Sequence, residues 1–138
     1  MNDPRAFLES YRYAFERFDL DDVLRHFTYP GLLVVDAGAV RQMPVVQKDW
    51  RKNVGGLLDA YKKMGVRQIR VVRADCRDLS PLLVLAEVEW SLRREDGSVI
   101  YDFHNLYVLG RVSGELKICS AVSPDENLKM RAALPPGL

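Results

Sequence analysis

Cysteine is scarce in this sequence, and neither sign of charge is in excess. The 138 residues include two cysteines, Cys76 and Cys119, with no C-x-x-C pair, so the ligand spacing of a zinc site is absent and we expect no metal. Lysine and arginine number 20 against 19 aspartates and glutamates, which gives a net charge of +1. Nucleic acid and anionic membranes both require a concentrated basic surface. We therefore expect neither of them as a partner.

Long hydrophobic runs are also absent. No apolar stretch approaches the roughly 20 residues that a membrane span requires, and the N-terminal segment MNDPRAFLES lacks the apolar core of a signal peptide. These absences predict a cytoplasmic protein. The composition, 48% hydrophobic and 28% charged, is typical of a globular protein. The length predicts a single domain over residues 1–138.

The first half of the sequence carries three helical patterns. Asp3 and Pro4 are a typical N-cap and first helical residue. Apolar side chains follow at helical spacing on one face: Phe7, Tyr11, Ala14, Phe15 and Phe18. A second helix begins near Asp19 and turns its apolar stripe inward, so we expect His26 on its outer flank. A third helix is expected over residues 46–64.

The rest of the sequence has the period of two that is typical of β-strands. We expect strands over residues 31–38, 39–43, 66–76, 81–95, 99–112 and 115–122, followed by a polar tail from residue 123. The order is therefore α-α-β-β-α-β-β-β-β, an α+β fold. Leu83 and Leu85 give the strand at 81–95 a second apolar face, which a sheet covered by helices on one side does not need. This surplus predicts a homodimer through the sheet face.

Three phrases carry a family resemblance. They are YRYAFERFDLDDVLRHF at 11–27, EVEWSLRREDG at 87–97 and NLYVLGRVSGELKI at 105–118. In this order and spacing, they resemble the nuclear transport factor 2-like superfamily, which includes ketosteroid isomerases and SnoaL-type cyclases. The resemblance implies a cone-shaped, curved antiparallel sheet of about six strands wrapped around the N-terminal helices, with a core over residues 5–122. It also implies an apolar pocket for a hydrophobic small molecule.

The ketosteroid isomerase pattern can be laid on this chain residue by residue. Its oxyanion-binding tyrosine falls on Tyr11, a match. Its general base falls on Val35, one residue before Asp36, and one residue on a strand reverses the face. A one-residue gap in the alignment before the strand would bring Asp36 to the position of the general base, on the same face as in the pattern. The second oxyanion donor of the pattern falls on Asp102 or His104.

The inward face of the strand at 99–112 is left open by the sequence. If Asp102 and His104 face the pocket, they form a pair that can move a proton near neutral pH. If the more apolar face with Tyr101 and Tyr107 points inward, Asn105 is the polar anchor and His104 faces a partner subunit or water. The residues expected to line the ligand site are Phe15, Tyr29, Trp50, Trp90, Phe103 and Asn105.

Two functions follow from this pattern. One is a cofactor-free acid–base enzyme, an isomerase, cyclase or dehydratase acting on a hydrophobic carbonyl substrate. The alternative is a non-catalytic ligand-binding or dimerisation module of the same fold. The sequence shows no Ser-His-Asp order, no glycine-rich phosphate loop and no metal spacing, so we expect no cofactor.

Overall fold

The computed structural model describes residues 3–134, which form four helices and one six-stranded sheet. The elements are α1 (Pro4–Glu16), α2 (Leu20–Arg25), β1 (Phe27–Asp36), β2 (Val40–Val45), α3 (Gln47–Met64), β3 (Gln68–Ser80), β4 (Leu83–Arg93), β5 (Val99–Val112), β6 (Glu115–Ser123) and α4 (Glu126–Ala133). The predicted α+β order is confirmed, with α4 added where a polar tail was expected. Residues 135–138 of that tail lie outside the described residues.

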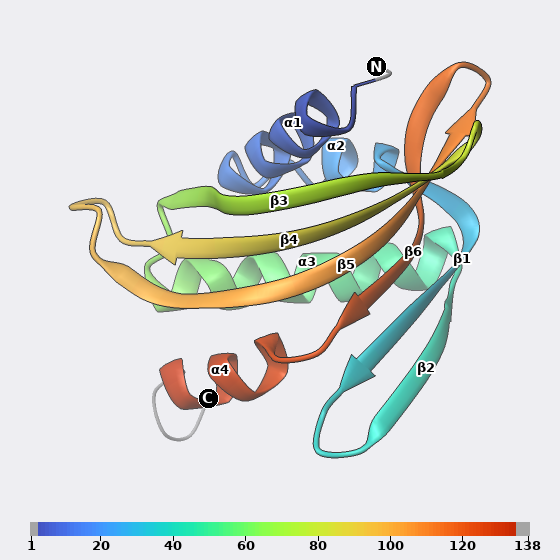
Figure 1. Ribbon diagram of the computed structural model, residues 1–138. Coiled ribbons are helices and arrows are strands. Elements are labelled where there is room, and N and C mark those ends of the chain that lie inside the picture. The colour runs from blue at the N-terminus through green and yellow to red at the C-terminus, as the bar shows by residue number, and fades with distance from the viewer. Residues whose placement is uncertain (1–2, 135–138) are drawn as a thin grey trace.

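The strands follow the order β2-β1-β6-β5-β4-β3 across the sheet. Neighbouring strands are antiparallel except β1 and β6, which are parallel. Figure 1 shows the long strands β3, β4 and β5 curving past the helices α1 and α3, while α4 lies beside β5. The expected cone-shaped sheet around the N-terminal helices is therefore confirmed.

Helix α1 forms for the reasons visible in its first residues. The Asp3 carboxylate accepts a hydrogen bond from the Arg5 backbone N–H at 3.0 Å. Pro4, which has no N–H, occupies the first helical position. Its inward side chains are buried against the sheet: Phe7, Leu8, Tyr11, Ala14 and Phe15. Helix α3 ends at Met64 and is capped by Gly65, whose φ of +84° is the left-handed conformation that glycine adopts without strain.

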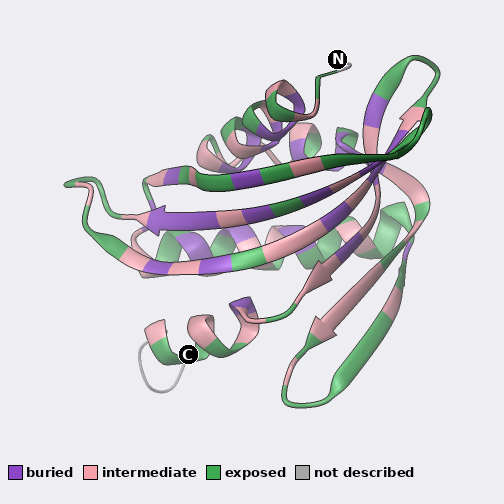
Figure 2. Ribbon diagram, in the orientation of Figure 1, coloured by how far each residue is buried: buried purple, intermediate pink, exposed green. Residues whose placement is uncertain are grey.

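Alternation along β4 and β5 decides which side chains face the helices. The buried set on these strands is Val84, Ala86, Val88, Trp90, Leu92, Tyr101, Phe103, Tyr107 and Leu109, and the alternating colours of Figure 2 follow it. Trp90 is paired with Phe103 across the two strands, and Glu89 with His104. Successive side chains point to opposite faces, so this burial pattern shows which face of the strand at 99–112 points inward. The apolar face with Asn105 points inward, and His104 is exposed on the other face.

The expected position of His26 was wrong. Helix α2 ends at Arg25, so His26 is its C-cap rather than a residue on its flank. The ring is 7% exposed and packs against Phe7 and Tyr11, with centroids 5.3 and 5.5 Å away. The turn out of the helix has therefore brought this histidine inward.

No helix within residues 3–134 is both long enough and apolar enough to cross a membrane.

Candidate functional site

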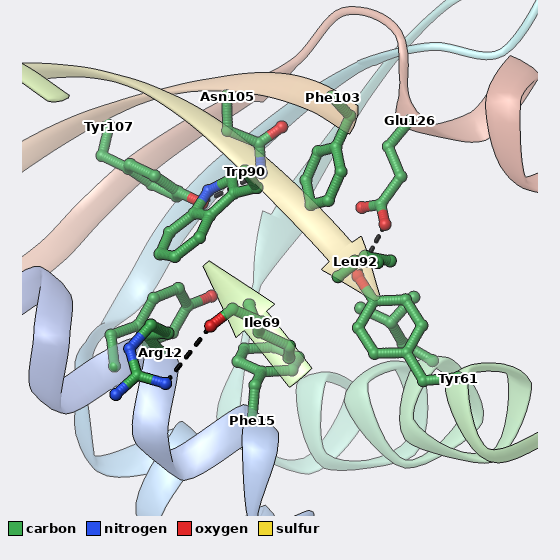
Figure 3. Close-up of a pocket in the computed structure, with 12 residues that line it drawn as sticks. Arg12, Phe15, Tyr61, Ile69, Trp90, Leu92, Phe103, Asn105, Tyr107 and Glu126 are labelled. Carbon is green, nitrogen blue, oxygen red and sulfur yellow. Dashed lines mark hydrogen bonds between the residues drawn. The ribbon is translucent and has the colours of Figure 1, made fainter. Parts of the chain in front are cut away.

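A cavity of about 60 Å³ lies between α1, α3, the inner face of β3–β5 and the start of α4 (Figure 3). Most of its wall is aromatic or aliphatic, and its polar groups come from a carboxyl, an amide, a guanidinium and three phenols. The lining residues are Tyr11, Arg12, Phe15, Leu57, Tyr61, Ile69, Trp90, Leu92, Phe103, Asn105, Tyr107 and Glu126. An apolar pocket with a few convergent polar groups is typical of a small-molecule site.

Glu126 is the acidic group of this cavity. It is the first residue of α4 and is 8% exposed. Its Oε2 accepts hydrogen bonds from the hydroxyls of Tyr61, at 2.6 Å, and Tyr101, at 2.9 Å; Figure 3 shows the carboxyl pointing toward Tyr61. Burial raises the pKa of Glu126 to about 7, against the opposing effect of the two phenol hydrogen bonds. A carboxyl with this pKa can both take and return a proton at neutral pH.

Two further phenols supply hydrogen-bond donors. The oxygen of Tyr107 accepts from Trp90 Nε1 at 3.0 Å and from Asn105 Nδ2 at 2.9 Å. Both lone pairs are then occupied, so the phenol's own proton remains free to be donated. The Tyr11 ring lies 6.0 Å from that of Tyr107, and its hydroxyl has no hydrogen-bond partner within the described chain. Burial raises the pKa of both phenols, which therefore stay protonated.

Arg12 closes one side of the cavity and holds α1 against the sheet. Its Nη1 donates to the carbonyl of Ile69 at 3.2 Å and to Glu16 Oε2 at 3.0 Å, and its Nε donates to Glu9 at 2.8 Å. Glu16 Oε2 also accepts from the Ile69 backbone N–H at 2.8 Å. The guanidinium charge is thus balanced by two carboxylates, which suits a structural role at the rim.

Half of the residues predicted from the sequence meet in this cavity. They are Tyr11, Phe15, Trp90, Phe103 and Asn105. Their common feature is a place on the buried face of a regular helix or strand. Periodicity predicted the helix and strands that carry them, but it left open whether the face of β5 with Phe103 and Asn105 points inward.

Asp36 is not at the cavity. It is the last residue of β1, it is exposed, and its Oδ1 accepts a hydrogen bond from the Gly38 backbone N–H at 3.0 Å. The carboxylate therefore closes the turn between β1 and β2, a common role for aspartate in turns. The structure does not bring it to Tyr11.

Asp102 and His104 lie on the face of β5 that points away from the cavity. His104 Nδ1 lies 3.1 Å from Asp125 Oδ2, and its Nε2 lies 3.2 Å from Glu89 Oε2. The carbonyl of Asp102 accepts a hydrogen bond from Lys129 Nζ. These groups attach α4 to the outer side of β5, and the pair is separated from the phenols by the strand itself.

Tyr29 and Trp50 also lie outside the cavity wall. The Tyr29 hydroxyl donates to the Leu24 carbonyl at 3.0 Å, which ties β1 to α2. The Trp50 ring packs edge-on against Phe27 with centroids 5.4 Å apart. Both side chains serve packing between β1 and the neighbouring helices.

Glu126 and its hydrogen bonds to two phenols are the candidate site features that sequence reasoning missed. Pro124 and Asp125 do mark a helix start, so α4 could have been found. The burial of its first carboxylate could not, because Tyr61 and Tyr101 lie 65 and 25 residues away along the chain.

The curved sheet and the helices packed inside it define a cone-shaped α+β fold. The chain belongs to the family described as NTF2-like protein (DUF6841), whose model matches residues 2–126. A comparison with curated protein sequences found no match.

Solved structures of the same fold are similar at low sequence identity. An NTF-2-like protein of unknown function from Shewanella oneidensis MR-1 is 13% identical, with a TM-score of 0.71 over 88% of this chain and 95% of that one. A protein with a cystatin-like fold from Nostoc punctiforme PCC 73102 has a TM-score of 0.70 at 13% identity, over 97% and 90% of the two chains. A ketosteroid isomerase-like protein from Erwinia carotovora atroseptica SCRI1043 has a TM-score of 0.64 at 13% identity, over 87% and 91%. These likenesses establish the fold.

Proposed function

We propose that this protein transfers a proton within a small carbonyl compound held in the cavity, without a cofactor, as an isomerase, cyclase or dehydratase would. The observation that carries the proposal is Glu126, a buried carboxyl in an apolar cavity whose pKa is raised to about 7 by that burial. Perturbed carboxyls in clefts are typical of general acids and bases. Relatives at 13% identity supply only the fold, so the proposal depends on this residue.

The proton transfer uses two kinds of group. The substrate's carbonyl oxygen accepts hydrogen bonds from the free phenol protons of Tyr11 and Tyr107. Ionised Glu126 removes a proton from the carbon next to the carbonyl, and the negative charge moves onto the oxygen between the two phenols. If the compound has a carbon–carbon double bond next to that carbon, Glu126 returns the proton to the far end of the double bond, which isomerises the compound. Otherwise the enolate expels a leaving group from the neighbouring carbon, or closes a ring by attacking a second carbonyl of the same molecule, whose oxygen then takes up the proton.

The size of the cavity limits the substrate. Its volume of about 60 Å³ is less than half of the ~150 Å³ of a buried apolar cavity that holds benzene. The part of the substrate inside is therefore a few heavy atoms, and a longer molecule must extend past the rim. A compact ketone or aldehyde fits this limit better than a fused-ring compound.

The test is hydrogen–deuterium exchange at the carbon next to the carbonyl, followed by NMR for a panel of small ketones and aldehydes in D₂O. We expect exchange to rise with pH through a midpoint near 7, because Glu126 must be ionised to act. Glu126→Gln should slow it by roughly 100-fold or more. Asp36→Asn is the matched control, and its rate should equal that of the unmodified protein. Equal rates in the Glu126→Gln and unmodified proteins would exclude Glu126 as the base.

A second function, dimerisation, is favoured by the outer face of the sheet. Leu85 is paired with Val108 across β4 and β5, and Leu106 lies beside Val122 of β6; all four point away from the helices and are only half-buried. Contiguous apolar residues on a surface indicate an interaction site, and we propose a second copy of this chain as the partner. Sedimentation should show a dimer, and Leu106→Glu should convert it to a monomer. A monomeric unmodified protein would contradict the proposal.

A further inference from the structure

We propose that Ser10 and His26 form a second site, in which Ser10 is a nucleophile that hydrolyses small carboxylic esters. Ser10 lies in α1 and His26 follows α2. Ser10 Oγ lies 2.9 Å from His26 Nε2. A hydroxyl within hydrogen-bond reach of an imidazole that is itself oriented by a third group is the arrangement that activates a serine. Neither residue takes part in the proton transfer proposed for Glu126.

The third group fixes which nitrogen of His26 carries the proton. Nδ1 lies 2.6 Å from the backbone carbonyl of Asp22. A carbonyl can only accept, so Nδ1 must donate to it. Burial lowers the pKa of His26 below its usual value of 6.5, so the ring is neutral at pH 7 and Nε2 presents a lone pair. The hydrogen bond to Nε2 is therefore donated by the Ser10 hydroxyl, as general-base activation requires.

The position of Ser10 supports the same conclusion. A serine inside a helix commonly turns its hydroxyl back to the carbonyl four residues earlier. Here the hydroxyl is directed to His26 instead. The His26 ring is held on its other sides by Phe7 and Tyr11, so Nε2 is fixed in place facing the serine.

A hollow of about 210 Å³ opens beside the pair and provides space for an ester. It is lined by Phe7, Ser10, Asp22, Arg25, His26, Glu115, Leu116 and Lys117. Lys117 Nζ donates to the Arg25 carbonyl at 2.5 Å, and the ammonium has two further N–H groups. The cations of Lys117 and Arg25 supply positive charge for the oxygen of a tetrahedral intermediate. Each cation also has an acidic neighbour: Arg25 lies 3.4 Å from Asp22 Oδ1, and Lys117 lies 3.9 Å from Glu115 Oε2. The other oxygen of Asp22 is paired with Arg17 at 2.5 Å.

The reaction balances with water as the second substrate. Ser10 Oγ attacks the ester carbonyl while Nε2 takes the hydroxyl proton. The protonated imidazole gives this proton to the departing alkoxide, which leaves as an alcohol, and the acyl group remains on Ser10. Water then attacks the acyl group in the same way, which releases the carboxylic acid and restores the Ser10 hydroxyl.

The test uses diisopropyl fluorophosphate for covalent labelling and p-nitrophenyl acetate for turnover, on the full-length protein. We expect one adduct per chain, located on Ser10 by mass spectrometry. Ser10→Ala should abolish the adduct, and His26→Gln should slow labelling by roughly 100-fold or more. The matched controls are Ser120→Ala, a half-buried serine on β6, and His104→Gln, the other histidine of the chain. Both controls should label at the unmodified rate, as should Glu126→Gln, which separates this site from the cavity.

The pH profile of labelling is measured on the unmodified protein, so it tests the proposal even if a variant fails to fold. Labelling should increase with pH through a midpoint below 6.5, because burial favours the neutral form of His26. Three outcomes would overturn the proposal: no adduct on Ser10, an equal rate in His26→Gln, or a flat pH profile. A purely structural Ser10–His26 hydrogen bond predicts all three.

Discussion

Asp125 and Glu126 are consecutive carboxylates whose surroundings could hardly differ more. Asp125 Oδ1 accepts from the backbone N–H of His104 at 2.9 Å, on the outer side of β5. Glu126 Oε2 accepts from the Tyr101 hydroxyl at 2.9 Å, on the inner side of the same strand. The start of α4 therefore places one carboxylate on each side of the edge of β5.

Their pKa values move in opposite directions for identifiable reasons. Burial would raise the pKa of Asp125, but hydrogen bonds from His104 and the charge of Lys129 outweigh it, so the pKa is lowered. For Glu126, burial is the dominant cause, and the hydrogen bonds from the two phenols do not offset it. The difference teaches that the pKa of the same chemical group is raised or lowered according to its burial and to the donors and charges beside it.

The largest expected effect is on stability as a function of pH. The folded protein holds the Glu126 proton more tightly than the unfolded chain, with pKa values of about 7 and 4.5. The stabilisation is complete below pH 4.5 and is lost as pH rises toward 7, by about 3 kcal/mol. Glu126→Gln should remove this dependence, measured by urea unfolding at pH 4.5 and 8. Parallel pH curves for the two proteins would contradict the raised pKa.

Tyr107→Phe removes the hydroxyl that Trp90 and Asn105 donate to, on the inner side of β5, and leaves both carboxylates in place. It leaves the buried indole N–H of Trp90 without its acceptor, which costs roughly 1–3 kcal/mol. It also removes the acceptor of the half-buried Asn105 amide. The variant should also slow deuterium exchange of a bound ketone, because one donor to the carbonyl oxygen is gone. Tyr13→Phe, at an exposed position of α1, is the control and should leave unfolding and exchange unchanged. An unaltered exchange rate in Tyr107→Phe would remove this phenol from the mechanism.

Tyr101→Phe removes one of the two phenol hydrogen bonds to Glu126 and so tests what these bonds contribute to its difference from Asp125. The hydrogen bond from Tyr101 lowers the pKa of Glu126, so its loss should raise that pKa further above 7. The cost in stability should be roughly 1–2 kcal/mol. The measurement is the pH midpoint of exchange, or the carboxyl ¹³C shift of Glu126. A midpoint that moves down would show that the phenols do not stabilise the ionised form.

Asp125→Asn should have the smallest effect. Its partner His104 has a half-exposed side chain, and water weakens such a pair, so we expect a loss below about 1 kcal/mol. The lowered pKa of Asp125 means that its contribution is present above the unfolded value of 3.8 and is lost as pH falls through the folded value. The difference in unfolding free energy between the two proteins should therefore be smaller at pH 3 than at pH 7. A loss of stability as large as that from Tyr107→Phe would show that water does not weaken the pair of Asp125 and His104.

The fold was predictable because its signals are local. The apolar spacing of α1 and the Asp96-Gly97 turn between β4 and β5 need no knowledge of distant residues. The inward face of β5 was not predictable, since both of its faces carry apolar side chains. The structure assigned it through the packing of Tyr101 and Phe103 against the helices.

The polar groups of the two sites were harder to predict because their partners are distant in sequence. Asp36 lies one residue after the position of the general base in the ketosteroid isomerase pattern. On a strand, a shift of one residue moves the side chain to the opposite face. Glu126 depends on Tyr61, which is 65 residues away. His26 depends on Ser10, on a different helix. Periodicity identifies buried faces, but it does not say which polar side chains meet there.

The position of Glu126 on the last helix, after all six strands, has a consequence for the evolution of this fold. A chain that stopped at Ser123 would keep all six strands and the three preceding helices. It would lose Glu126, the one buried carboxylate among residues 3–134. The sheet and the proposed proton-transfer group therefore come from separate segments of the chain, so substitutions after β6 can change this group while leaving the sequence of the six strands unaltered.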